Sequence, residues 1–285
     1  MVKTSNKNNR VSFSMVITYI ILLVWVSITI VTVGWVIMTS FKSNQELFAN
    51  IWKLPEKLHF ENYVRAWTHG NMQVYFFNTV LYLIITLAVL TVFGSMASYV
   101  LVRYKKFRWV GWIFILIIAG MSIPGQLAVI PLYITYARVG LLNTYVGMIL
   151  LYCAVFMPFT VFVLSGFFRT VPFEIEEAAQ IDGASKFRTF AEIVMPMVKP
   201  GLVTVIIFNF LSIWNEYFYA MVLITDEKKM PLSAGLYNLK SQQQMGLDWV
   251  GLFAGVVILL VPTMIMFFIM QDKIAKGVTA GAIKG

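Results

Sequence analysis

The sequence predicts an all-α membrane protein: one polytopic bundle of six transmembrane helices. The composition is 59% hydrophobic and only 12% charged, whereas soluble domains carry roughly 25% charged residues. The mean hydropathy is +0.79. The apolar residues gather in six long runs, and a run of about 20 residues is enough to cross the hydrocarbon core of a bilayer. Together these observations favour a bundle of membrane-spanning helices over a soluble fold.

The six runs define the expected domain. The first is too long for a signal-peptide core and is followed by no small-residue cleavage site, so we expect an uncleaved span. The transmembrane domain then covers residues 15–271, with polar tails at 1–14 and 272–285. The spans are expected at about 15–38, 74–102, 109–130, 144–168, 200–224 and 249–270.

Prolines interrupt two of the expected spans. Pro124-Gly125 lies within the third, which predicts a kink or a broken helix, although a simple helix end fits equally well. A broken span can line a cavity, because its freed backbone groups need water or protein partners. Pro158 predicts a kink in the fourth span.

The distribution of basic residues predicts the orientation. Six spans place both termini on one side of the membrane. With the N-terminus inside, fourteen of the 22 Lys and Arg residues fall in inner segments and eight in outer loops. Short cytoplasmic loops carry an excess of these residues, so we expect both termini and the loop at 169–199 in the cytoplasm of a bacterial cell.

Several function classes are disfavoured. The net charge of +9 is spread over short loops between apolar runs, which argues against a nucleic-acid partner. Cys153 is the sole cysteine, so neither a disulfide nor a cysteine-based metal site can form within the chain. His59 and His69 lack a ligand pattern, so no metal site is expected. No spacing supports a nucleophile–base pair, so no catalytic residues are expected.

The polar loop at 169–199 predicts two helices joined by a sharp turn. Pro172 suits the first turn of a helix, and three glutamates follow where the helix dipole favours negative charge. Gly183 offers a stop, because glycine adopts the left-handed conformation without a Cβ clash. Ser185 can cap a second helix that runs to about Pro196.

The first of these helices has a small, flat face. Ile175, Ala178, Ala179 and Asp182 share one side, because they are spaced three and four residues apart. Two alanines allow another body to approach closely, and nearby carboxylates can pair with its basic groups. A docking surface is therefore one interpretation. An amphipathic helix lying on the bilayer fits the periodicity equally well.

The residues of this loop resemble the EAA signature of ABC importer permeases. The order and spacing match EAA-x3-G-x9-I-x-x-P, with Met195 where the family usually has Leu. In that family the loop forms a coupling helix that sits in a cleft of the cytoplasmic ATPase subunit. The resemblance implies that the residues coupling this chain to an ATPase are Glu177, Ala178, Ala179, Asp182, Gly183, Ile193 and Pro196.

The fifth expected span contains one acidic residue, Glu216, deep in an apolar run. An ionisable group at that depth is costly and is therefore a functional candidate. Helical spacing predicts one polar stripe that faces a pathway or a partner. A structural hydrogen bond to a neighbouring helix is the alternative. The expected pathway residues are Asn209, Ser212, Asn215, Glu216 and Tyr219.

Similarity to a sugar-importing branch extends along the whole chain. Trp214-Asn215-Glu216 resembles a motif of that branch, and the segment 277–285 resembles the glycine-rich tail of MalG-type subunits. This resemblance implies a type I importer permease of the carbohydrate-uptake class. Such a subunit pairs with a second, related permease in the lipid bilayer, sits on two ATPase subunits and receives sugar from an extracellular binding protein. The loop at 225–248 is the candidate contact for that protein.

The chain is expected to bind no cofactor. It lacks the G-x4-G-K-[ST] phosphate loop, so ATP and Mg belong to the partner ATPase subunits and the chain is not itself an enzyme.

Other transport functions stay open at this point. The same machinery could carry a polyol, a glycerol phosphate or a peptide, although the spans hold no deep Lys or Arg for a phosphorylated solute. An ion-coupled transporter with Glu216 as its proton site is a third possibility. A membrane-embedded enzyme ranks last, because Glu216 lacks a catalytic partner. The identity of the sugar is not encoded in any motif recognised here.

Overall fold

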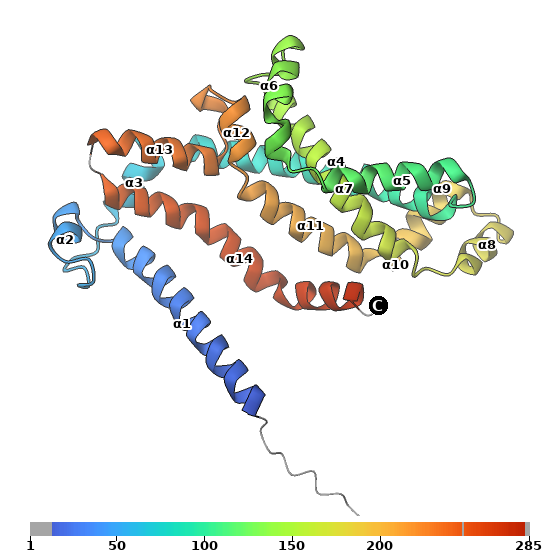
Figure 1. Cartoon of the computed structure of the whole chain (residues 1–285), viewed down its shortest axis with the longest axis horizontal. Helices are drawn as coiled ribbons and strands as arrows, with labels where there is room; N and C mark the ends of the chain where they lie inside the picture. Colours follow the sequence, from blue (N-terminus) through green and yellow to red (C-terminus); the bar gives the residue numbers. More distant parts are fainter. Residues whose placement is uncertain (1–12, 247, 283–285) are drawn as a thin grey trace, which may run out of the picture.

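The computed structural model describes residues 13–246 and 248–282, and every regular element in them is a helix. The predicted tail at 1–14 and the end of the 277–285 segment lie largely outside these residues. Long helices run between two ends of the molecule (Figure 1). One end carries α2 (Asn44–Ala49), α3 (Glu61–Thr68) and α13 (Leu232–Gly246). The opposite end carries α8 (Phe173–Ile181), α9 (Lys186–Arg188) and α10 (Met195–Met197).

The number of membrane spans agrees with the predicted fold class. Four helices are long and apolar enough to cross a bilayer alone, and two bent helix pairs raise the count to as many as six in the described residues. The single helices are α1 (Phe13–Ser40), α4 (Met72–Arg103), α7 (Tyr145–Phe168) and α14 (Trp249–Ala282). The pairs are α5 (Arg108–Met121) with η1 (Gly125–Ala128) and α6 (Val129–Arg138), and the segment Lys186–Met197 with α11 (Lys199–Trp214).

The third span is broken where Pro124-Gly125 predicted an interruption. The two arms, Arg108–Met121 and Gly125–Arg138, meet at an angle of 91°, and α6 turns sharply away from α5 (Figure 1). Pro124 itself has extended backbone, with φ −59° and ψ 118°, so the helix cannot continue through it. The broken-helix interpretation is therefore confirmed over a simple helix end.

The prediction of one continuous fifth span over 200–224 was wrong. α11 ends at Trp214, and α12 (Phe218–Leu223) begins after a break at 215–217. α7, in contrast, continues through Pro158 as one helix. The last span is longer than expected, because α14 remains helical to Ala282.

The bundle is built around α4, which packs along α7 and also against α11. Small residues permit the close approach: a Cβ on Gly94 would lie 2.6 Å from the Thr160 methyl carbon, and Ser98 Oγ donates a hydrogen bond to the Val161 carbonyl at 3.2 Å. Tyr82 and Leu90 of α4 are fully buried in the central apolar cluster. α4 is therefore the central helix of the bundle, and the loops at both ends of the molecule pack against it.

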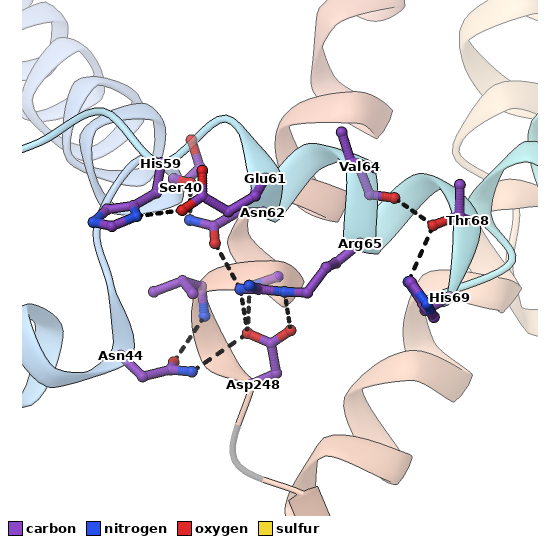
Figure 2. Close-up of polar contacts among 12 residues, drawn as sticks. Ser40, Asn44, His59, Glu61, Asn62, Val64, Arg65, Thr68, His69 and Asp248 are labelled. Atoms are coloured by element: carbon purple, nitrogen blue, oxygen red, sulfur yellow. Dashed lines mark hydrogen bonds and ion pairs between the residues drawn. The ribbon is translucent and has the colours of Figure 1, made fainter.

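A polar network, here called the Asp248 network, ties α2 and α3 to the start of α14. Figure 2 shows the Arg65 guanidinium between the side chains of Asn62 and Asp248. Arg65 Nε lies 3.3 Å from Asp248 Oδ2, and Asn44 Nδ2 donates to Asp248 Oδ1 at 3.4 Å. Asp248 Oδ1 also accepts the Gly251 backbone N–H at 3.1 Å, which caps the first turn of α14. The network predicts a rigid end of the molecule around α2, α3 and the start of α14.

Removing the carboxylate of the Asp248 network tests this interpretation. We expect Asp248→Ala to lower the free energy of unfolding by about 0.5–2 kcal/mol, because a helix loses its N-cap. Asp248→Asn should cost less, since asparagine caps helices about as well as aspartate. The measurement is the thermal unfolding midpoint of the solubilised chain. Equal midpoints for Asp248→Ala and the unchanged protein would show that the network contributes no stability.

The helix α1 stands apart from the bundle. It diverges from α14 towards its N-terminal end (Figure 1), and none of its most apolar 18-residue window is buried. Its contacts gather near its C-terminal end. There the Trp35 ring meets Phe253 edge-on, with ring centroids 5.3 Å apart, and lies 6.1 Å from the Trp52 ring. Its apolar surface is therefore available to lipid or to another membrane helix.

Candidate functional site

The loop at 169–199 folds into the two helices that its sequence predicts. α8 begins directly after Pro172, whose φ of −59° suits a helix entry. The chain turns at Gly183, where φ is +86°. Ser185 Oγ accepts the Arg188 backbone N–H at 3.3 Å and caps the second helix. The positive φ at Gly183 confirms the sharp turn.

The second helix is irregular in a way that the sequence did not reveal. α9 continues through η2 (Thr189–Val194), a π-helical segment, into α10. Ile193 lies half-buried within the π segment and Pro196 is exposed at its end. The Phe190 ring lies 5.0 Å from that of Tyr99, which anchors the segment to α4. Such π segments occur frequently at functional sites.

The structure divides the predicted docking face of α8. Ala179 is 7% exposed and packs inward, whereas Ala178, Asp182 and Glu177 are exposed. Glu176, the neighbour of Glu177, is 1% exposed and points inward to Arg103. The exposed face of α8 therefore lies one position away from the face that periodicity suggested.

Two large apolar side chains extend this surface, and sequence reasoning missed both. Ile181 is 87% exposed and Phe187 is 72% exposed, on either side of the Gly183 turn. Exposed apolar patches mark contacts with a protein partner or with a membrane, so these two side chains are candidates for such a contact. The available signal was their position: each is a bulky apolar residue close to a helix-stopping glycine in an otherwise polar stretch.

The break between α11 and α12 places Glu216 as the cap of the short helix. Glu216 Oε1 accepts the Tyr219 backbone N–H at 2.7 Å, and Oε2 accepts the Ala220 N–H at 3.4 Å. Oε2 also accepts the Tyr152 hydroxyl of α7 at 2.9 Å. The Ser233 hydroxyl of α13 donates to the Glu216 carbonyl. This residue thus joins three elements at the point where the fifth span is interrupted.

The other residues of the predicted pathway do not form a single stripe, because α11 ends before Glu216. Asn209 is buried and donates to Thr160 Oγ1 of α7 at 2.8 Å. Ser212 is exposed and bonds to the Phe208 carbonyl of its own helix. Tyr219 lies against Gly125 at the bend of the third span, where a Cβ would clash with the tyrosine hydroxyl. The two broken spans therefore meet.

A cavity of about 290 Å³ opens beside the break. Asn215 and Tyr217 line it from the break, and Tyr237 and Lys240 line it from α13. The Tyr217 and Tyr237 rings lie nearly parallel, with centroids 6.3 Å apart, and each residue is about half exposed (48% and 47%). The cavity thus combines two accessible aromatic faces with an amide and an ammonium group.

The loop before α13 is held in place by polar contacts. It contains η3 (Glu227–Lys229), a short 3-10 turn capped by Asp226. The Lys228 backbone N–H that donates to Asp226, together with the Lys229 ammonium at 3.1 Å, holds the pKa of this carboxyl below its usual range. Asn143 Oδ1 accepts the Asp226 N–H at 3.0 Å. The loop therefore has a defined shape at the end of the molecule that carries α13.

Comparison of the sequence with known proteins identifies the family of this chain. Residues 90–280 match the model of the binding-protein-dependent transport system inner membrane component. The chain is 39% identical to the diacetylchitobiose uptake system permease protein NgcG of Streptomyces coelicolor, over 94% of this chain and 88% of that protein. It is 32% identical to the melibiose/raffinose/stachyose import permease protein MelC of Bacillus subtilis, over 87% and 88%.

The fold also matches solved structures. A bacterial ABC transporter that imports the acidic polysaccharide alginate contains a chain that matches with a TM-score of 0.75 at 20% identity, over 90% of this chain and 95% of that one. The methionine ABC transporter MetNI matches with a TM-score of 0.52 over 70% of this chain. The predicted type I importer fold is confirmed. The family model, the relatives and the fold agree, and the chain belongs to the inner membrane permease components of binding-protein-dependent ABC importers.

Proposed function

We propose that this permease carries a neutral sugar or oligosaccharide into the cell. The observation that supports this most is the similarity, over most of the chain, to permeases named for diacetylchitobiose and for melibiose, raffinose and stachyose. The cavity beside the fifth-span break has a suitable chemistry, because aromatic faces offer apolar area while Asn215 supplies hydrogen bonds.

The proposed assembly pairs this chain with a second, related permease on two ATPase subunits, which bind ATP and Mg. The coupling residues are Glu177, Ala178, Ala179, Asp182, Gly183, Ile193 and Pro196, to which the exposed Ile181 and Phe187 are added. An extracellular binding protein delivers the sugar to the outer end. Support comes from the family membership and from the exposed apolar surfaces of α1, α5 and α6, which lipid and the second permease can cover.

The proposed pathway runs past the two broken spans. Asn215 lines the cavity beside the break, Tyr219 joins the pathway where it lies against Gly125, and Glu216 holds the break in place. Freed backbone groups at membrane depth are tolerated where they line a cavity, which makes such a break a suitable substrate site. Asn209 contributes by fixing α11 on α7, and Ser212 faces outward from α11.

The orientation is tested by cysteine labelling. In a Cys153→Ser background, a cysteine at position 185 should react with an impermeant maleimide only from the cytoplasm, and one at position 243 only from outside. The positive-inside bias places the coupling loop in the cytoplasm. Labelling of position 185 in intact cells would reverse the proposed topology.

The substrate is tested on the complete complex. We expect the binding protein that works with this permease to bind one or more sugars in a titration with a mono- and oligosaccharide panel. The same sugars should stimulate ATP hydrolysis by the complex in lipid nanodiscs. Controls are polyols, glycerol phosphate and peptides. Stimulation by one of these, with no response to any sugar, would contradict the sugar assignment.

A further inference from the structure

A buried ion pair fixes the coupling helix to the inner end of α4. Arg103, the last residue of α4, donates through Nε to Glu176 Oε1 at 2.5 Å, and the two side chains are only 10% and 2% exposed. The Tyr99 hydroxyl donates to Glu176 Oε2 at 2.6 Å. Arg103 Nη2 donates to the Val171 carbonyl at 3.0 Å. We call Tyr99, Arg103 and Glu176 the inner clasp.

The two neighbouring glutamates of α8 have different surroundings. Both oxygens of Glu176 are bonded inside the chain, and the residue is 1% exposed. Glu177 is exposed, and no hydrogen bond or ion pair to its carboxylate is found in the described part of the chain. Two adjacent acids of one helix therefore have different roles in the fold: Glu176 points towards α4, whereas Glu177 is left on the exposed surface of α8.

The outer end of α4 carries a second set of polar contacts. Asn78 Nδ2 donates to the carbonyls of Lys228 and Met230, both at 2.9 Å. Tyr82 donates to the Lys229 carbonyl at 2.8 Å, and the Leu232 backbone N–H donates to Thr79 Oγ1 at 2.7 Å. We call Asn78, Thr79 and Tyr82 the outer clasp. It holds the loop at 228–232 to α4.

Between the clasps, α4 is one uninterrupted helix. It has 32 residues and contains no proline, so at 1.5 Å per residue it is about 48 Å long. It packs along α7 and α11 through the central core. A helix packed in this way transmits displacement along its length, because interiors are dense and have low compressibility.

We propose that Glu176 is a positioning residue, and that the inner clasp makes α8 and α4 move as one body, linking the loop at 228–232 to the ATPase-facing surface. This rests on the proposed docking of α8 on an ATPase. Opening the clasp would leave the Arg103 charge buried without a partner, which is strongly unfavourable. The clasp therefore stays closed while α8 shifts, and any movement of α8 is passed to α4.

The paired variants Glu176→Gln and Glu177→Gln separate positioning from docking. In the complete complex in nanodiscs, Glu176→Gln should keep its ATPase subunits while the stimulation of hydrolysis by loaded binding protein falls about ten-fold. The probe is the panel sugar that stimulates the wild-type complex most. Glu177→Gln should instead reduce the amount of ATPase subunit that co-purifies. Normal stimulation in Glu176→Gln would overturn the proposal.

A covalent replacement of the clasp provides the second test. In the Cys153→Ser background, Arg103→Cys with Glu176→Cys should show the same loss of stimulation. Bridging the two thiols with a short bis-methanethiosulfonate should restore it, and reduction should abolish it again. Bridging that leaves stimulation absent in an assembled complex would show that α8 must separate from α4. A lower amount of ATPase subunit co-purifying with Glu177→Gln reports only on the docking of α8, whether or not bridging restores the stimulation of hydrolysis. The docking proposal and the inner-clasp proposal therefore fail independently.

Discussion

Replacing Gly183 by valine should abolish transport while the chain still reaches the membrane. Gly183 has φ +86°, and a β-branched residue enters this region at a cost of roughly 1–2 kcal/mol. No atom lies within 4 Å of a Cβ built on Gly183, so backbone conformation alone carries the penalty. The turn would open and the second helix would point elsewhere. Uptake by the assembled importer and the membrane level of the chain are the two measurements.

Two matched variants isolate the role of the turn. Gly166→Val introduces the same side chain in α7, where a Cβ also meets no atom within 4 Å but the backbone is helical. It should leave uptake close to normal. Gly183→Asn should retain most of the activity, because asparagine tolerates the left-handed region. Full uptake by Gly183→Val would show that the observed turn is dispensable.

Truncating Glu216 should lower both transport and the yield of assembled complex. Glu216→Ala removes the acceptor for the Tyr152 hydroxyl and for two backbone N–H groups of α12. Each buried donor left unsatisfied costs about 1–3 kcal/mol. α12 would lose its cap, and the break at 215–217 would lose its tie to α7. Complex yield after solubilisation and sugar uptake are measured together.

Glu216→Gln separates the shape of the break from its charge. Glutamine keeps one oxygen acceptor, and the Tyr152 hydroxyl can rotate to accept from its amide. The complex should therefore assemble and hydrolyse ATP when binding protein is added. Uptake should still weaken if the charge acts in the pathway. Wild-type uptake at unchanged affinity in this variant would exclude a role for the charge. Complete loss of uptake, together with loss of any dependence of uptake on the proton gradient, would favour an ion-coupled carrier.

Local sequence signals were sufficient for most of the span pattern and for the fold of the loop at 169–199. The apolar runs, the interruption at Pro124-Gly125 and the capped helices around Gly183 all depend on residues close together in the chain. Their physical causes are hydrophobic length, proline sterics and glycine freedom, which act over a few residues. The structure confirms the interruption and the capped turn, whereas the fifth span stops at Trp214 and the last one continues to Ala282.

The remaining features depend on partners distant in sequence. The inward turn of Glu176 depends on Arg103, 73 residues earlier, and the fifth-span break is stabilised by Tyr152, 64 residues before Glu216. No periodicity reveals such pairs. The sequence Trp214-Asn215-Glu216 contains no proline or glycine at the break, so helix-breaking signals were absent. Burial of Ala179 likewise follows from the packing of α8, which helical spacing alone does not determine.

The isolation of α1 has a consequence for how this chain can change over evolutionary time. α1 lies outside the region matched by the family model, which begins at residue 90, and contributes no buried residue before Thr39. The α1 sequence before Thr39 is therefore constrained mainly by contact with lipid and with whichever subunit covers it. Exchange of one aliphatic residue for another should therefore be neutral along most of its length. The segment can drift, or be grafted between relatives, while the remaining spans stay constrained by one another.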